Sequence, residues 1–144
     1  MKINVKIALF LKKIIFVFVS AFFLNWIWES LHSYLYVHYQ GGPITQTLLA
    51  RAAFIDAFFI TTLWLFFQFI PYFKKRVWFT VFFGVIAAII LEKYALNFGR
   101  WAYNEHMPII PLLRVGLTPT VQLGILSFFV FKYVDKVFGR GEIK

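Results

Sequence analysis

Residues 14–36 have the sequence IIFVFVSAFFLNWIWESLHSYLY, and this stretch decides the class of protein. About 20 mainly apolar residues are the length that an α-helix needs to cross the hydrocarbon core of a bilayer. Three further runs of this kind cover residues 51–72, 77–98 and 109–133. The sequence therefore predicts an all-α integral membrane protein, in which residues 1–144 form a single domain built as a four-helix transmembrane bundle.

The composition agrees with this class. Of the 144 residues 61% are hydrophobic, 22% are aromatic and only 15% are charged, and the mean hydropathy is +0.75. Soluble domains contain about 25% charged residues. Disordered chains, coiled coils and disulfide scaffolds are excluded. Because the chain contains no cysteine, thiolate zinc sites and cysteine nucleophiles are excluded as well.

The net charge of +9 would suit a nucleic-acid partner, but the position of the basic residues indicates membrane orientation instead. Eleven of them precede the first run, lie in the link between the second and third, or follow the fourth. These three places are on one side of the membrane, and only Arg51, Lys93, Arg100 and Arg114 lie on the other side. Basic residues prefer cytoplasmic loops. We therefore expect both termini in the cytoplasm and no nucleic-acid partner. The cytoplasmic set is Lys2, Lys6, Lys12, Lys13, Lys74, Lys75, Arg76, Lys132, Lys136, Arg140 and Lys144.

Polar residues inside the first run share one helical face. Asn25, Glu29, His32 and Tyr36 are spaced by four, three and four residues, which aligns them along a helix. A charge at the centre of a transmembrane helix costs roughly 2.5 to 3.5 kcal/mol even on a lenient scale. This face is therefore expected to point into the bundle.

Two further acids are expected near this face. At about 1.5 Å per residue, Glu29 and Glu92 lie at a similar depth in the outer half of the membrane, and Asp56 also lies in that half. Two carboxyl groups in a poorly hydrated cavity do not both ionise cheaply, so one would keep its proton and serve as a general acid. The predicted catalytic residues are Glu92 as the acid, with Glu29 or His32 as its partner.

The fourth run is expected to be broken. Pro108, Pro111 and Gly116 disfavour regular helix before Thr118, which suits an N-cap and is followed by Pro119 at the first helical position. Residues 109–117 would then enter the outer half as irregular backbone, and the new helix would aim its positive end at the acids. The predicted substrate-binding residues are Asn25, Asp56, Arg100, Trp101, Tyr103, Arg114 and Thr118. Trp101 and Tyr103 also suit the role of interfacial anchors.

The acids are also compatible with a structural role and with metal binding. In the structural role they pair with basic residues and only hold the helices together, with Glu92–Arg100, Glu92–Arg114 and Asp56–Arg51 as the expected pairs. In a metal site, Glu29 and His32 would form a Glu-x-x-His motif, but such sites need a second copy of the motif, which this chain lacks. We therefore expect no metal and no cofactor.

Residues 92–103 have the sequence EKYALNFGRWAY, and Met107-Pro108 and Gly116-Leu117-Thr118-Pro119 follow them. Together with Asn25-x-x-Trp28-Glu29, this pattern resembles a family of small, uncharacterised bacterial four-span membrane proteins. More remotely, it is similar to membrane enzymes of the lycopene cyclase and carotenoid hydratase type. The first resemblance implies a bacterial membrane, whereas the second implies an isoprenoid substrate and roles for Glu92, Trp101 and Tyr103. Where the cyclases have Pro-x-Glu-Glu, this chain has Pro119-Thr120-Val121-Gln122.

Several functions are compatible with these features. The first is an intramembrane acid/base enzyme that isomerises, cyclises or hydrates an isoprenoid or another apolar lipid, with aromatic faces stabilising a developing cation. The alternative is a binding or transport module, in which the helix end at Thr118 and the arginines hold an anionic lipid or small substrate. A purely structural membrane protein is the third. Membrane lipids are the expected partners, and a homo-oligomer is compatible with all three.

Overall fold

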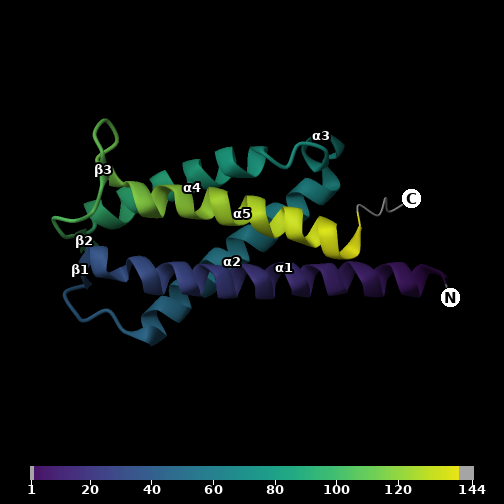
Figure 1. Cartoon of the computed structure of the whole chain (residues 1–144), viewed down its shortest axis with the longest axis horizontal. Coiled ribbons are helices and arrows are strands. Elements are labelled where there is room, and N and C mark those ends of the chain that lie inside the picture. The colour runs from purple at the N-terminus through teal and green to yellow at the C-terminus, as the bar shows by residue number, and fades with distance from the viewer. Residues whose placement is uncertain (1, 140–144) are drawn as a thin grey trace.

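The computed structural model describes residues 2–139, and four long helices make up most of it (Figure 1). Each of the four is long enough and apolar enough to cross a membrane, as the sequence predicted. A short helix, α3, links the second long helix to the third. The helices are α1 (Lys2–His32), α2 (Gln46–Phe69), α3 (Pro71–Lys74), α4 (Phe79–Asn97) and α5 (Leu117–Phe138).

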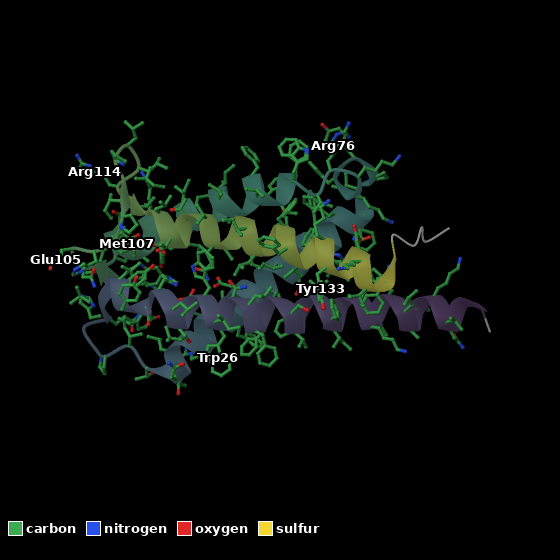
Figure 2. The ribbon with its side chains drawn as sticks, in the orientation of Figure 1. Trp26, Arg76, Glu105, Met107, Arg114 and Tyr133 are labelled. Atoms are coloured by element: carbon green, nitrogen blue, oxygen red, sulfur yellow. The ribbon has the colours of Figure 1, made fainter. Side chains whose placement is uncertain are left out.

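The helices pack mainly as two pairs, α1 with α2 and α4 with α5, and α5 also packs against α1. The start of α1, helix α3 and the end of α5 lie at one end of the molecule, and the strands lie at the other (Figure 1). Arg76 marks the first end and Arg114 the second (Figure 2). The basic link between α2 and α4 therefore shares an end with the basic start of α1. Arg140 and Lys144, which also belong to the predicted cytoplasmic set, lie outside the described residues.

Two glycines allow α4 and α5 to touch through their backbones. A Cβ atom built on Gly84 would lie 2.4 Å from the backbone nitrogen of Gly124, and one on Gly124 would lie 2.7 Å from the carbonyl oxygen of Val81. Small residues at helix contacts permit this close approach. The contact fixes α5 against α4 and so sets where the polar residues of α5 face.

Apolar side chains both fill the interior and cover the outside of the helices. Ile60, Trp64 and Phe67 of α2 belong to the same buried cluster as Val130 and Phe131 of α5, and the rings of Phe67 and Phe131 are in contact. The helices also expose large apolar side chains; examples are Ile15 at 62%, Phe58 at 66%, Ile90 at 63% and Phe129 at 58%. Such an outer surface is typical of helices that face lipid.

The fold is not entirely helical, because two short antiparallel strand pairs close the end opposite α3. Strand β1 (Tyr36–Tyr39) pairs with β2 (Trp101–Tyr103). Helix α1 ends at His32, and a single 3-10 turn, η1 (Ser33–Leu35), leads into β1. The predicted helix through Tyr36 is therefore wrong at its end, because pairing with β2 takes up the backbone groups of β1.

The second strand pair corrects the prediction for the fourth run. Residues 109–116 form a hairpin of β3 (Ile109–Ile110) and β4 (Val115–Gly116) with an exposed tip, where Leu112 is 96% exposed. Helix α5 then starts at Leu117 with Gly116 as its N-cap, two residues before the predicted cap at Thr118. The N–H of Leu117 donates to the carbonyl of Pro108 at 2.7 Å, which closes the hairpin and satisfies a first-turn donor.

Candidate functional site

A cavity of about 310 Å³ lies at the strand-bearing end of the helices. Side chains from α1, β1, α2, α4 and α5 line it, together with Arg100 and Trp101. Three of its lining residues are acids, Glu29, Asp56 and Glu92, which come from three different helices. The structure thus brings together acids that lie up to 63 positions apart in the chain.

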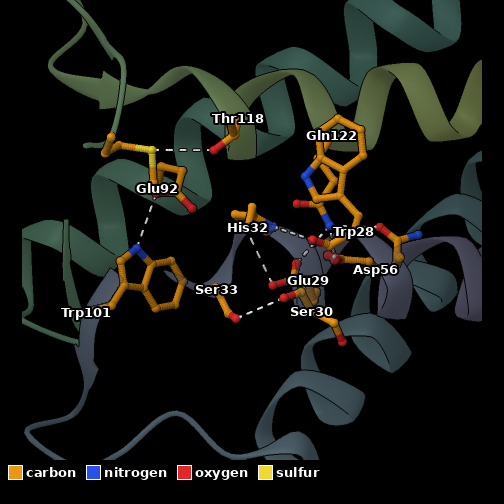
Figure 3. Close-up of polar contacts among 12 residues, drawn as sticks. Trp28, Glu29, Ser30, His32, Ser33, Asp56, Glu92, Trp101, Thr118 and Gln122 are labelled. Carbon is orange, nitrogen blue, oxygen red and sulfur yellow. Dashed lines mark hydrogen bonds and ion pairs between the residues drawn. The ribbon is translucent and has the colours of Figure 1, made fainter. Parts of the chain in front are cut away.

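Glu92 is buried and is held by two neutral donors. The indole Nε1–H of Trp101 donates to its Oε2 atom at 3.2 Å, and the hydroxyl of Tyr103 donates to the same oxygen (Figure 3 shows the Trp101 contact). Among the described residues, no group hydrogen-bonds to the other oxygen, Oε1. Glu92 therefore has one oxygen fixed by the protein and one left for a proton or a ligand.

The turn after α4 explains how Trp101 and Tyr103 reach Glu92. Gly99 has φ +61°, its N–H donates to Leu96 O at 3.2 Å, and the N–H of Arg100 donates to Ala95 O at 2.8 Å. This double hydrogen bond is a Schellman motif, which suits glycine because a left-handed residue follows the helix. The motif turns the chain back along α4 and lays β2 beside Glu92.

Tyr103 also connects Glu92 to the start of α5. The backbone N–H of Gly116, the N-cap residue of α5, donates to the Tyr103 hydroxyl oxygen at 2.9 Å. Burial, and secondarily the hydrogen bond to Glu92, raise the pKa of Tyr103 above its usual value. Tyr103 therefore stays protonated and remains a donor to Glu92 throughout the physiological pH range.

Gln122 of α5 organises the other half of the site. Its amide nitrogen, Nε2, lies 2.8 Å from Glu29 Oε1, 3.0 Å from Asn25 Oδ1 and 3.2 Å from Asp56 Oδ2. An amide nitrogen has two hydrogens, so it cannot fully satisfy three acceptors. Glu29 of α1 and Asp56 of α2 are thus brought to the same amide group.

His32 lies beside this group and has a defined tautomer. Its Nδ1 atom lies 2.7 Å from the carbonyl oxygen of Trp28, so Nδ1 must carry the hydrogen. The other nitrogen, Nε2, lies 3.9 Å from Glu29 Oε2. In the view of Figure 3, His32 lies between Glu92 and the group formed by Glu29, Asp56 and Gln122. Nε2 is therefore the atom of His32 that faces Glu29, and in this tautomer it carries a lone pair.

Aromatic rings form one wall of the cavity. Tyr36 packs against His32 with ring centroids 5.5 Å apart, and it meets Trp101 and Tyr103 at 6.2 and 5.4 Å. Tyr39 stacks on Trp101 at 6.2 Å. Although Tyr36 is not helical, the pairing of β1 with β2 keeps it beside His32. Aromatic faces in this position attract positive charge.

The predicted ion pairs are absent from the described part of the chain. Among residues 2–139, neither Arg51 nor Arg100 forms an ion pair with an acid of the cavity, although both line it. Arg114 lies on the exposed turn between β3 and β4, outside the cavity. The expected pairs were wrong because neutral donors, Trp101 and Tyr103 for Glu92 and Gln122 for Asp56, take those positions.

The remaining predicted site residues lie beside the cavity or away from it. Asn25 is fully buried behind it and accepts from Gln122, while its own Nδ2–H donates to Ala21 O at 2.8 Å. Thr118 is not among the lining residues, and its hydroxyl donates to the sulfur of Met107 at 3.4 Å. Asp56, Arg100 and Trp101 line the cavity, as do the predicted catalytic residues.

Sequence reasoning did not identify Gln122 as a site residue, although it contacts polar groups on both α1 and α2. A signal was present, because Gln122 is a strongly polar side chain within an apolar run, three residues after Pro119. The Glu-x-x-His motif does not extend to a metal centre. Within the described residues, no group of three or more His, Asp or Glu side chains is arranged to hold a metal ion.

No protein-family model, curated protein or solved structure matches this chain.

Proposed function

We propose that the four long helices cross a bacterial cytoplasmic membrane, with the α3 end in the cytoplasm and the cavity in the outer half of the bilayer. Two features support this placement: the exposed apolar side chains along the helices, and the basic residues in the start of α1, the α2–α4 link and the end of α5, which share one end of the molecule (Figure 1). Because the acids line a cavity between the helices, they avoid the free-energy cost of placing a carboxyl group against lipid.

We further propose that the protein is an intramembrane acid/base enzyme that acts on an isoprenoid or another unsaturated apolar lipid. The observation that carries this proposal is the environment of Glu92, a buried carboxyl group beside a cavity. Its Oε2 is held by two neutral donors, and within residues 2–139 its Oε1 has no hydrogen-bond partner. A structural acid would be expected to use both oxygens or to pair with a base.

The proposed reaction begins with proton transfer from Glu92 to one carbon of a substrate double bond. A C–H bond forms, the π bond is lost, and the neighbouring carbon becomes cationic. The faces of Tyr36 and Trp101 stabilise that cation. Loss of a proton from an adjacent carbon to Glu29 yields an isomer, whereas addition of water followed by loss of a proton to Glu29 yields a hydrate. His32 accepts the proton from Glu29 and returns it to solvent, and Glu92 takes up a proton from solvent before the next turnover.

The resemblance of residues 92–103 to carotenoid-pathway membrane enzymes supports the same substrate class. In this proposal Glu92, Trp101 and Tyr103 keep the roles that the resemblance implies. The cyclases have a glutamate at the position of Gln122. Because a glutamine supplies no acid there, we favour isomerisation or hydration over cyclisation.

The test uses purified protein in detergent micelles prepared in D2O, with an acyclic polyisoprenoid as the probe and mass spectrometry as the readout. We expect a product that carries one new carbon–deuterium bond from solvent, with one original hydrogen lost if the product is an isomer and none lost if it is a hydrate. Glu92→Gln, which keeps the shape but cannot donate the acidic proton, should reduce product formation by at least roughly 100-fold. Its melting temperature should stay close to that of the parent.

Glu105→Gln is the matched control, because Glu105 is an exposed acid outside the cavity. This variant should retain full activity. Equal deuterium incorporation in the parent and in Glu92→Gln would refute the assignment of Glu92 as the acid. If the folded parent converts no polyisoprenoid or unsaturated lipid, the enzyme proposal fails.

One observation favours the alternative of a binding or transport module. Arg51 and Arg100 line the cavity without ion-pair partners among the described residues, which suits an anionic ligand. In that case the ligand would be recovered unchanged and without deuterium. Thr118 has no part in this alternative, because it does not line the cavity.

A further inference from the structure

The cavity opens sideways between α2 and α4. Among its lining residues, Ile55 on α2 is 64% exposed, and Leu91 and Tyr94 on α4 are each 47% exposed. Lining residues that are also exposed mark the rim of an opening. Apart from the Tyr94 hydroxyl, this rim is apolar. In a membrane-spanning protein an opening between two helices leads into the bilayer, so a lipid chain can enter without crossing water.

Two arginines lie above this opening, nearer to the strand end. Arg51 is five residues before Asp56 on α2, which places it about 7.5 Å along the helix axis toward the strand end. Arg100 is the last residue of the Schellman motif, and its side chain contacts Tyr94. Its guanidinium carbon lies 5.2 Å from the ring centroid of Tyr94, and its Nη2 lies 3.5 Å from the Tyr94 hydroxyl.

The charge of both arginines is available to a ligand. Among residues 2–139 neither arginine has an ion-pair partner, even though three acids line the same cavity. Guanidinium groups bind phosphate oxygens through paired hydrogen bonds, and two of them suit a group with several charged oxygens. The cavity thus combines a cationic mouth, an apolar side opening and an acidic interior.

We propose that the ligand is a phosphate-headed isoprenoid lipid that enters between α2 and α4, with its phosphate at Arg51 and Arg100 and its first isoprene units beside Glu92. The isoprenoid chain and its conversion rest on the proposed function, whereas the phosphate site and the entry of a lipid chain between α2 and α4 rest on the cavity alone. The short axial separation between the arginines and the acids places the reacting double bond near the head of the lipid.

Binding is measured on the full chain in detergent by native mass spectrometry with three probes: a long-chain prenyl monophosphate, the matching prenyl alcohol and inorganic phosphate. We expect the prenyl phosphate to bind at least about tenfold more tightly than the alcohol. Inorganic phosphate should bind most weakly, because it has no chain for the apolar cavity. Tight binding of inorganic phosphate alone would assign the arginines to a free anion and overturn the lipid proposal.

The variants Arg51→Gln and Arg100→Gln should each weaken binding of the prenyl phosphate by about tenfold and leave binding of the alcohol unchanged. Arg100→Lys keeps the charge without the paired donors and should lose an intermediate amount. Lys93→Gln is the matched control, because Lys93 is exposed and lies outside the cavity. If the arginine variants bind prenyl phosphate as Lys93→Gln does, the headgroup site is refuted.

Ile55→Trp tests the side opening. The larger side chain would narrow the gap between α2 and α4, so both lipids should bind more slowly than to the parent, whereas inorganic phosphate should not be affected. Unchanged lipid binding rates would contradict entry by this route.

Failure of this inference is distinguishable from failure of the proposed function. Prenyl phosphate that binds as expected but takes up no deuterium in D2O would remove the enzyme proposal and leave the binding site intact. Conversion of a neutral polyisoprenoid, with no preference for a phosphate head in binding, would support the enzyme proposal and refute the headgroup site.

Discussion

At the residue scale, neutral donors hold the acids of the cavity where the sequence suggested cations. Trp101 and Tyr103 contact one oxygen of Glu92, and Gln122 contacts Glu29 and Asp56. A neutral donor orients a carboxyl group without committing it to the charged form as strongly as an arginine would. This arrangement is compatible with proton transfer from the carboxyl group. A buried ion pair would instead favour the ionised carboxylate, which has no proton to donate.

Tyr103 is the residue at which this arrangement is most easily tested. Tyr103→Phe removes the donor to Glu92 and the acceptor for the Gly116 N–H, so we expect a loss of about 1 to 3 kcal/mol in the free energy of unfolding. Thermal or denaturant unfolding in detergent measures this loss. Tyr34→Phe is a suitable control, because Tyr34 is 70% exposed. An equal effect of both substitutions would contradict the hydrogen-bonded role of Tyr103.

The raised pKa of Tyr103 also predicts a pH dependence. The folded protein holds this phenolic proton more tightly than the unfolded chain does, so the raised pKa contributes stability below the ordinary tyrosine pKa of 10.0. That contribution is lost as the pH rises above 10. The melting temperature of the parent should therefore fall more steeply between pH 9 and pH 11 than that of Tyr103→Phe. Parallel curves would show that Tyr103 titrates like a free tyrosine.

At the element scale, the contact between α4 and α5 positions the site. The two helices touch at Gly84 and Gly124, and this contact holds Gln122 of α5 toward α1 and α2 while Glu92 of α4 faces the same cavity. The Schellman turn at Gly99 and the pairing of β1 with β2 then bring Trp101 and Tyr103 over Glu92.

Gly84→Ala tests the helix contact. The new methyl group would lie 2.4 Å from the backbone nitrogen of Gly124, so the helices must separate, at a cost of about 1 to 3 kcal/mol. We expect a clear drop in melting temperature. Gly42→Ala makes the same chemical change where the nearest atom, Tyr39 O, is 3.5 Å away, and it should have little effect. If Gly84→Ala is as stable as Gly42→Ala, the backbones are not in contact.

At the scale of the whole molecule, the two ends differ in chemistry. The basic link between α2 and α4 lies at the α3 end, and the acid-lined cavity lies at the strand end. In the proposed orientation the cavity lies in the outer half of the membrane, near the lipid headgroups of the outer leaflet. A lipid of the outer leaflet then has direct access to the opening between α2 and α4.

The orientation is tested by inserting a reporter enzyme that is active only outside the cytoplasm. Insertion at Lys75, in the link between α2 and α4, should give no signal if this link lies in the cytoplasm as proposed. Insertion at Gly42, in the turn after β1, should give a strong signal. The opposite pair of results would place the cavity in the inner leaflet.

The number of long helices and the interior position of several polar residues could be predicted from the sequence alone. A run of apolar residues as long as a bilayer is thick has few other stable structures, so each of the four runs contains a long helix. The position of the break before α5 was also predictable to within two residues, because Pro108, Pro111 and Gly116 act on the local backbone.

Only the tertiary structure decided which polar groups meet. Gln122 lies 93 positions from Glu29 in the chain and 66 from Asp56, and its contacts with them depend on how far each helix is rotated about its axis. The inward position of Trp101 and Tyr103 depends on strand pairing between residues more than 60 positions apart. A sequence specifies the period and polarity of each helix, whereas the rotation and approach of neighbouring helices come from packing, here the touching backbones at Gly84 and Gly124. For that reason the acids were visible in the sequence, as were Trp101 and Tyr103, but the hydrogen bonds that these residues and Gln122 make to the acids were not.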